Sequence, residues 1–269
     1  MKLADKVIVI TGGADGIGRG LAERFLKERP KAVVICDINE PKVKAVAAEI
    51  GAAAACGCDV SSEAQMVAMI DDVEKRFGPI DLFCSNAGIG DFTGSDPNFV
   101  GAASNEVWQR SWEVNVMQHV YAARALVPRM KQRGGGYFLI TASAAGLLSQ
   151  IGSAVYATTK HAAVGFGEIL AITHRDDGVR VSLLCPQAVD TPLLRAGGEG
   201  PQHIDGVLTP AELAETVVQG LDEERFLILP HPQVLGYMQN KAGNYDRWIG
   251  GMAKLRRSFG GNFGPAGRN

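Results

Sequence analysis

Short apolar segments alternate with longer amphipathic segments along most of the chain. Val7–Ile10 and Val33–Ile35 are apolar at every position, as expected of parallel strands covered by helices on both faces. Strands are predicted at Val7–Thr11, Ala32–Asp37, Ala52–Cys58, Asp81–Cys84, Gly136–Thr141, Val179–Cys185 and Phe226–Leu229. Helices are predicted between them at Ile17–Glu28, Pro41–Ile50, Glu63–Phe77, Glu106–Arg133, Ser153–Thr173 and Ala211–Leu221.

This alternation predicts an α/β fold: a single doubly wound Rossmann domain with a seven-stranded parallel sheet and helices on both faces. No linker, repeat or low-complexity tract divides the chain, so residues 1–259 are expected to form one domain. From about residue 230 this domain carries an apolar and aromatic extension, and residues 260–269 form a glycine-rich tail.

The composition removes several function classes. The chain has 269 residues and a formal net charge of −2, which gives no electrostatic case for nucleic acid. No apolar stretch approaches the roughly 20 residues that span a bilayer, and the first apolar stretch is typical of a strand rather than of a signal peptide. The five cysteines and five histidines lack metal-ligand spacing. We therefore expect a cytoplasmic protein with reduced thiols and no metal, membrane or nucleic-acid partner.

A glycine-rich segment, Thr11-Gly-Gly-Ala-Asp-Gly-Ile-Gly18, joins the first predicted strand to the first predicted helix. Glycines at such a turn let the backbone approach a pyrophosphate, and the helix N-terminus supplies N–H groups and positive potential. The spacing is G-x-x-x-G-x-G, which differs from the commoner dinucleotide fingerprint. Its position between strand and helix nevertheless favours a dinucleotide site over a tight turn without a ligand.

Asp37 ends the second predicted strand, twenty-one residues after Gly16. A carboxylate there accepts hydrogen bonds from the adenosine ribose hydroxyls and repels a 2′-phosphate. Asp15 adds negative charge on the same side. Arg19 is a cation that could neutralise a phosphate, but its position favours a solvated arginine in the first turn of the helix. The balance of these charges predicts NAD as the cofactor rather than NADP.

Asp59 and Val60 follow the third predicted strand and have two interpretations. They meet the adenine of the cofactor, or they belong to a helix cap built by Ser61 or Ser62. The sequence leaves both interpretations open.

Tyr156 and Lys160 lie four residues apart in a predicted helix, and Ser143 lies thirteen residues before Tyr156. Residues at this spacing share one helix face. A phenol has a pKa of about 10, and a neighbouring ammonium lowers that pKa because it favours the phenolate. The spacing therefore fits a tyrosine acid/base tuned by a lysine, although a surface pair on a helix has the same spacing.

From about Lys6 to Leu229, the chain resembles the short-chain dehydrogenase/reductase family in the order and spacing of its motifs. The glycine-rich segment resembles the family's cofactor loop. Ser85-Asn-Ala-Gly88 resembles the family's Asn-Asn-Ala-Gly segment, with Ser85 in place of the first Asn. Cys185-Pro-Gln187 resembles a Pro-Gly turn, with Gln187 in place of Gly. The family's catalytic tetrad is matched by Asn115, Ser143, Tyr156 and Lys160.

The resemblance implies hydride transfer between NAD and an alcohol or ketone. It implies that Tyr156 exchanges a proton with the substrate, while Ser143 holds the substrate oxygen. Lys160 is expected to lower the Tyr156 pKa and to bond the nicotinamide ribose, and Asn115 to position a water that links Lys160 to solvent. Predicted cofactor contacts are Gly12, Asp15, Gly16, Ile17, Gly18, Asp37, Ile38, Asp59, Val60, Asn86, Ala87, Gly88, Tyr156, Lys160, Pro186, Val189 and Thr191.

Three segments are predicted to surround the substrate. Leu193–His203 is glycine-rich and fits a mobile lid, and the Gly90–Ser104 stretch supplies Phe92 and Phe99. The C-terminal extension is expected to cap the pocket or to join subunits through Leu235, Tyr237, Met238, Trp248 and Met252. These apolar walls favour a hydrophobic secondary alcohol or ketone over a sugar. Gln187 either shapes specificity or is an ordinary turn residue.

Two other functions remain open. An NADPH-dependent ketoreductase is disfavoured by Asp37, and a non-catalytic NAD-binding regulator is disfavoured by the complete tetrad. The resemblance also implies a homodimer or homotetramer that pairs through the helices at Glu106–Arg133 and Ser153–Thr173. Trp108 and Trp112 on the first of these helices are expected to serve packing or the subunit interface.

Overall fold

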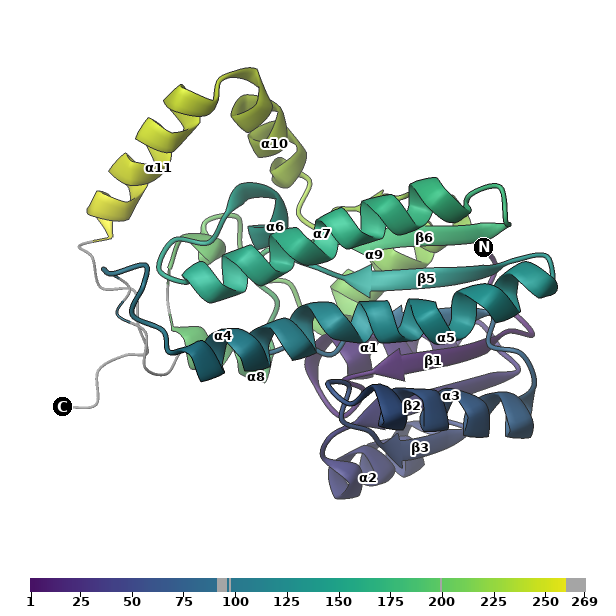
Figure 1. Ribbon diagram of the computed structural model, residues 1–269. Helices are drawn as coiled ribbons and strands as arrows, with labels where there is room; N and C mark the ends of the chain where they lie inside the picture. The colour runs from purple at the N-terminus through teal and green to yellow at the C-terminus, as the bar shows by residue number, and fades with distance from the viewer. Residues whose placement is uncertain (91–95, 97, 199, 260–269) are drawn as a thin grey trace.

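Seven parallel strands form the centre of the computed structural model, in the order β3-β2-β1-β4-β5-β6-β7 (Figure 1). The structure describes residues 1–90, 96, 98–198 and 200–259. The strand order reverses between β1 and β4, and ligands of doubly wound sheets bind at that switch point. The strands are β1 (Val7–Thr11), β2 (Ala32–Asp37), β3 (Ala54–Gly57), β4 (Leu82–Ser85), β5 (Gly136–Thr141), β6 (Val179–Leu184) and β7 (Leu227–Ile228).

Helices cover both faces of the sheet, as predicted. Successive residues of β1 enter different cores: Val7 and Val9 pack with α3, α5 and α7, whereas Ile8 and Ile10 pack with α1, α2 and α9. This alternation explains why β1 is apolar at every position. The helices are α1 (Gly16–Leu26), α2 (Glu40–Ile50), α3 (Glu63–Phe77), α4 (Asn105–Trp112), α5 (Gln118–Gln132), α6 (Ala145–Leu148), α7 (Ala154–His174), α8 (Pro192–Gly197), α9 (Pro210–Asp222), α10 (Gln233–Gly243) and α11 (Tyr245–Ser258).

One predicted helix is interrupted. The continuous helix expected over Glu106–Arg133 is α4, a π-helical segment at Glu113–Met117, and α5. The wider turn holds Asn115, whose side-chain amide bonds to Ile89 and Thr159 outside this helix. Hydrophobic periodicity does not reveal such a turn because the helix continues on both sides of it.

The C-terminal extension is helical and projects beyond the sheet as an arm (Figure 1). Val234 of α10 is fully buried and packs with Ala144 and Leu148 beside the end of β5. Lys241 Nζ donates a hydrogen bond to the carbonyl of Leu147 at 2.7 Å. No residue of α11 is buried, so this helix lies on the rest of the protein with one face only.

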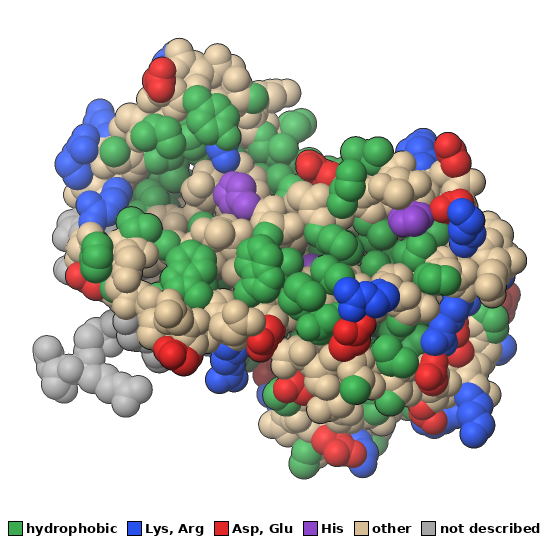
Figure 2. All heavy atoms as spheres, viewed as in Figure 1, with side chains coloured by type: hydrophobic (Ala, Val, Ile, Leu, Met, Phe, Trp, Pro, Cys, Tyr) green, Lys and Arg blue, Asp and Glu red, His purple; other side chains and the backbone are tan. Residues whose placement is uncertain are grey.

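Hydrophobic side chains also gather on the outer surface over α4, α5 and α7 (Figure 2). Trp112 of α4 is 40% exposed, and Ile169 and Ile172 of α7 are 56% and 74% exposed. A soluble helix normally turns such side chains inward, so this surface is a candidate for contact with another subunit.

Candidate active site

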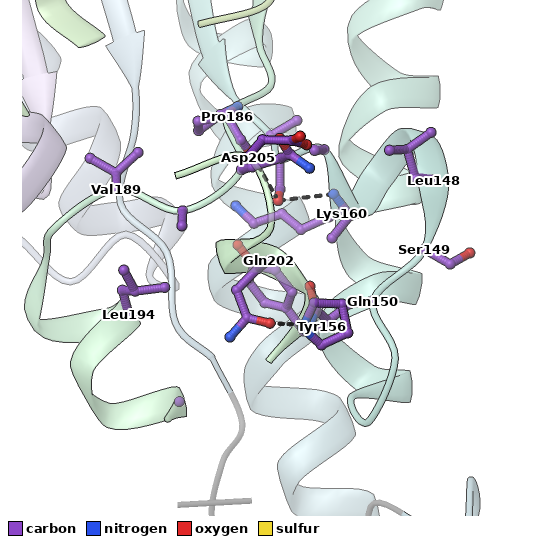
Figure 3. Close-up of a pocket in the computed structure, with 18 of the residues that line it drawn as sticks. Leu148, Ser149, Gln150, Tyr156, Lys160, Pro186, Val189, Leu194, Gln202 and Asp205 are labelled. Atoms are coloured by element: carbon purple, nitrogen blue, oxygen red, sulfur yellow. Dashed lines mark hydrogen bonds between the residues drawn. The ribbon is translucent and has the colours of Figure 1, made fainter. Parts of the chain in front are cut away.

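A cavity of about 980 Å³ lies at the carboxyl ends of the strands and is lined in part by α8 and by the C-terminal arm. Figure 3 shows some of the residues that line it. One end is formed by the loops after β1, β2 and β4, and the other by α8, α10 and α11. The cavity brings together most of the predicted site residues: Gly12, Asp15, Gly16, Ile17, Gly18, Asp37, Asn86, Ala87, Gly88, Ser143, Tyr156, Lys160, Pro186, Val189 and Thr191.

The glycine-rich loop packs directly on the loop after β4. Gly12 has φ +67°, and a Cβ there would lie 2.9 Å from the Cα of Ala87. Asn86 fixes the contact, because its Nδ2 donates to the carbonyl of Thr11 at 3.0 Å and its Oδ1 accepts from Thr141 Oγ1 at 3.0 Å. The close approach leaves bare backbone at the start of α1, which fits the pyrophosphate of a dinucleotide.

Asp37 lies in the same cavity at the end of β2. Its Oδ2 accepts a hydrogen bond from the N–H of Ala14 at 3.2 Å, and its Oδ1 accepts from the N–H of Asn39 at 3.0 Å. These bonds hold the carboxylate at the position expected for an adenosine ribose. The next residue, Ile38, is 69% exposed and lies outside the cavity lining.

Asp59 and Val60 also lie outside the cavity lining. Asp59 Oδ1 accepts from the N–H of Ser61 at 2.9 Å and from its Oγ at 2.7 Å, and Ser62 caps α3. Val60 is 7% exposed and belongs to the core. The local turn and cap therefore account for these residues, and their contact with adenine stays a prediction.

Ser143, Tyr156 and Lys160 meet near the middle of the cavity. Ser143 follows β5, and the first two turns of α7 carry Tyr156 and Lys160 on one face. Lys160 Nζ lies 5.7 Å from the centroid of the Tyr156 ring and donates to the carbonyl of Thr141 at 3.1 Å. The N–H of Ala145 donates to Ser143 Oγ at 3.1 Å, which orients that hydroxyl.

Burial governs the ionisation of this group. It lowers the pKa of Lys160 to about 8, because the ammonium is largely withdrawn from water. It raises the pKa of Tyr156, and a hydrogen bond with Ser143 opposes that rise. The expectation that Lys160 lowers the Tyr156 pKa is not met in this arrangement, in which the lysine bonds to the Thr141 carbonyl.

Asn115 lies beside this group but outside the cavity lining. Its side chain is fully buried, and Nδ2 donates to the carbonyl of Ile89 at 2.9 Å and to Thr159 Oγ1 at 3.1 Å. Oδ1 accepts from the N–H of Ile89 at 2.9 Å. The amide therefore ties the segment after β4 to α7, and its predicted role in positioning a water is a proposal.

Residues of the predicted lid segment and of the arm line the other end of the cavity. Gln150 Nε2 donates to Gln202 Oε1 at 3.2 Å, which joins the loop before α7 to the predicted lid (Figure 3). The arm contributes side chains to the wall: Tyr237, Trp248 and Met252. The prediction for Phe99 is wrong, because its side chain is 64% exposed and lies outside the lining, and Phe92 lies outside the described residues.

A family model described as short chain dehydrogenase matches residues 6–201 of this sequence. The chain belongs to the short-chain dehydrogenase family. A 1-deoxy-11-beta-hydroxypentalenate dehydrogenase of Streptomyces exfoliatus is 33% identical over 242 residues, which cover 85% of this chain and 84% of that protein. A 3beta-hydroxysteroid dehydrogenase 2 of Eggerthella lenta is 33% identical and covers 70% of this chain and 73% of that protein.

A solved structure supports the same assignment. A short chain dehydrogenase/reductase from Burkholderia phymatum in complex with NAD aligns with a TM-score of 0.81 at 29% identity, over 91% of this chain and 96% of that chain. This short-chain dehydrogenase is therefore an oxidoreductase that acts on a hydroxyl or carbonyl substrate with NAD or NADP. The predicted family and fold class are both confirmed.

The structure explains one departure of this short-chain dehydrogenase from the family pattern. Ser85, in place of the family's first Asn, has its Oγ 2.6 Å from Nδ1 of His119 on α5. His119 is 1% exposed, and burial lowers its pKa to about 3, so the imidazole is neutral. No sequence motif indicates a role for His119, because its partner lies on another element.

The cations near the glycine-rich loop are engaged in ion pairs. Arg19 pairs with Glu23 at 2.7 Å and with Glu49 at 2.5 Å, so two carboxylates already surround it. Asp15 forms an ion pair with Lys42, which lies outside the cavity lining. Lys42 lies in the first turn of α2, five residues after Asp37. This closeness in the sequence could have indicated that Lys42 lies near the carboxylates of the site.

The part of the chain that the structure describes holds no group of three His, Cys, Asp or Glu side chains arranged for a metal ion. Within the same residues, no helix has the length and apolar character needed to cross a membrane. All five cysteines are free thiols.

Proposed function

We propose that this short-chain dehydrogenase is an NAD-dependent alcohol dehydrogenase or carbonyl reductase for a hydrophobic secondary alcohol or ketone. The observation that carries the proposal is the convergence of Ser143, Tyr156 and Lys160 in a cavity that also contains the glycine-rich loop and Asp37. A binding module would need the loop but not a buried lysine beside a tyrosine, because burying an ammonium is costly.

Each residue has a proposed role in the oxidation of an alcohol. Bound NAD supplies the acceptor for the hydride. Ser143 Oγ holds the substrate oxygen close to Tyr156 Oη. The positive charges of Lys160 and of the oxidised nicotinamide favour the Tyr156 phenolate against the effect of burial, and Tyr156 Oη then takes the hydroxyl proton as general base. Lys160 keeps positive charge beside Tyr156 and bonds the cofactor ribose. In reduction, Tyr156 Oη returns the proton to the substrate oxygen. Thr191, Pro186 and Val189 hold the nicotinamide end of the cofactor.

The preference for NAD rests on charge. Asp37 is fixed by two backbone N–H groups at the end of β2, where a 2′-phosphate would meet its carboxylate. Arg19 is engaged by two glutamates, so it offers little to a phosphate. Lys42 is the observation that favours NADP. Its ammonium pairs with Asp15, and the 2′-phosphate of NADP would compete with Asp15 for that ammonium.

The substrate class rests on the apolar wall and on the relatives. The arm adds Trp248 and Met252 to a cavity wall that also holds Leu148 and Ile151. The two named relatives are dehydrogenases of a hydroxysteroid and of a hydroxypentalenate, and the first of these names denotes a polycyclic hydrocarbon skeleton. A homodimer or homotetramer in the cytoplasm, with no membrane or nucleic-acid partner, completes the proposal.

The deciding experiment is a spectrophotometric panel of hydrophobic and polyhydroxy alcohols with NAD and with NADP, on the wild type and on Tyr156→Phe. We expect NAD-linked oxidation of hydrophobic secondary alcohols, reduced about 10²–10⁴-fold or more in the variant because proton transfer is lost. Equal rates for both proteins would remove Tyr156 from the mechanism. Turnover of polyols alone would refute the substrate class.

A further inference from the structure

Two residues of the cavity lining each carry a buried acceptor atom that has no hydrogen-bond partner among the described residues. The atoms are Oε1 of Gln187 and Oδ2 of Asp205. Gln187 follows Pro186, whose carbonyl accepts a hydrogen bond from Ser143 Oγ at 3.5 Å. Gln187 is therefore the next residue after Pro186, whose carbonyl contacts Ser143, the residue proposed to hold the substrate oxygen. A glycine at position 187 would contribute no side chain to the cavity wall, whereas Gln187 contributes an amide.

Surrounding residues fix both groups in place. The N–H of Gln187 donates to Nδ1 of His231 at 3.2 Å, and His231 is 2% exposed. Burial lowers the pKa of His231, so its ring is neutral and accepts this bond. Asp205 Oδ1 accepts from the hydroxyl of Tyr237 on α10 at 3.1 Å. Only the second oxygen of the Asp205 carboxylate is left for a ligand.

The chemistry of the two free atoms limits what binds them. An ionised carboxylate oxygen and an amide carbonyl oxygen accept hydrogen bonds and donate none. Buried acceptors in folded proteins are almost always paired, because removing them from water without a partner is unfavourable. A substrate that is hydrophobic throughout, apart from its reacting hydroxyl, would leave both atoms unpaired in the cavity wall.

We propose that Gln187 and Asp205 form an accepting subsite that binds a second hydrogen-bond donor on the substrate. The preferred substrate is then a secondary alcohol with a hydrophobic skeleton and a second donor group, a hydroxyl or an ammonium. This inference rests on the proposed function and narrows its substrate class. It also gives Gln187 a role in specificity, which the sequence alone left open.

The test compares matched alcohols in the wild-type enzyme with NAD. The panel is cyclohexanol, the 1,2-, 1,3- and 1,4-cyclohexanediols, and the corresponding aminocyclohexanols. We expect kcat/KM for at least one compound with a second donor to exceed that for cyclohexanol about tenfold or more. The diol and amine arms distinguish a hydroxyl from an ammonium as the donor.

Two substitutions then assign the preference to these residues. Gln187→Met keeps the side-chain length without the acceptor, and Asp205→Asn can present a donor in place of the free oxygen. We expect each to lower the ratio of kcat/KM between the favoured compound and cyclohexanol about 10- to 100-fold. Gln239→Met is the matched control, because Gln239 lines the same cavity but is solvent-exposed. Its ratio should stay within about twofold of wild type.

Several outcomes would overturn the subsite. A ratio near one in the wild type, or an unchanged ratio in both variants, would do so. A rise in KM for NAD in Gln187→Met that is equal for every alcohol would assign Gln187 to the cofactor instead. Calorimetric titration of Tyr156→Phe loaded with NADH measures the same preference as a ratio of Kd values. That measurement tests the subsite even if the enzyme does not turn over these alcohols. Failure of the proposed subsite can therefore be distinguished from failure of the proposed dehydrogenase activity.

Discussion

Lys160 is the residue at which folding and the proposed chemistry conflict. Its ammonium is 3% exposed, and burial lowers its pKa from 10.5 to about 8. Between these two values the unfolded chain binds the proton and the folded chain does not. Stability from this group is therefore lowest below pH 8 and rises as the pH approaches 10.5. A shift of this size corresponds to about 3 kcal/mol of unfavourable free energy at pH 7.

We therefore expect Lys160→Met to be inactive but more stable. Methionine fills a similar volume without a charge, although the hydrogen bond to the carbonyl of Thr141 is lost. The free energy of unfolding at pH 7 should rise by about 1–3 kcal/mol, and the gain should shrink between pH 8 and pH 10.5. Urea unfolding across this pH range measures it. Lys75→Met, on the exposed face of α3, is the control, and a loss of stability in Lys160→Met at pH 7 would contradict the argument.

Asp37 supports a second prediction at the same scale. Asp37→Asn retains an oxygen acceptor for the N–H of Ala14 or Asn39 but removes the charge that a 2′-phosphate would meet. The ratio of kcat/KM for NADP to that for NAD should rise about tenfold or more, which is about 1.4 kcal/mol. Lys42 should contribute to the gained affinity, so adding Lys42→Met should reverse part of it. Parallel kinetics with both cofactors measure the ratio, and an unchanged ratio would remove Asp37 from cofactor choice.

At the scale of elements, hydrophobic periodicity along the sequence predicted the strands and helices whose positions depend on burial. The strands and long helices were predicted to within a few residues, because their apolar periodicity reports burial directly. The π-helical turn at Glu113–Met117 was missed, since it depends on Asn115 bonding to Ile89. The helices of the arm were missed, although the partly buried residues Trp248, Met252 and Leu255 recur along α11 at helical spacing.

The candidate site divides in the same way. The glycine loop, Asp37, Ser143 and the Tyr156–Lys160 pair were predictable, because each stands at a strand end or on one helix face. Residues whose roles depend on distant partners were not. His119 meets Ser85, and Asp205 meets Tyr237, only after the chain has folded. The spacing of these residues along the sequence does not predict those contacts.

The arm gives a prediction for a whole element. Removing residues 245–269 deletes α11, which contributes Trp248 and Met252 to the cavity wall but buries no residue of its own. The shortened chain should fold and bind NAD with unchanged Kd, while KM for hydrophobic alcohols rises about tenfold or more. Trp248→Ala should move KM in the same direction by less. Loss of NAD binding in the shortened chain would show that α11 serves the fold instead.

At the scale of the whole molecule, the apolar surface over α4, α5 and α7 predicts self-association. Ile169 and Ile172 project from α7 with 56% and 74% of their surface exposed. Light scattering after size exclusion should give a dimer or tetramer, and the pair Ile169→Glu with Ile172→Glu should shift the mass toward the monomer. Ile204→Glu is the control for added charge, because Ile204 is also 56% exposed but lies just after the lid segment, away from this surface. A monomeric wild type would remove this surface as an interface.

The arm also has a consequence for how the protein is made. The sheet is complete once β7, at Leu227–Ile228, has left the ribosome, whereas α10 and α11 are synthesised afterwards. Because domains fold during synthesis, the dinucleotide half of the cavity can form while the chain is still growing. The half that is proposed to select the substrate is finished last. Nascent chains halted just after β7 should already be captured by an immobilised dinucleotide.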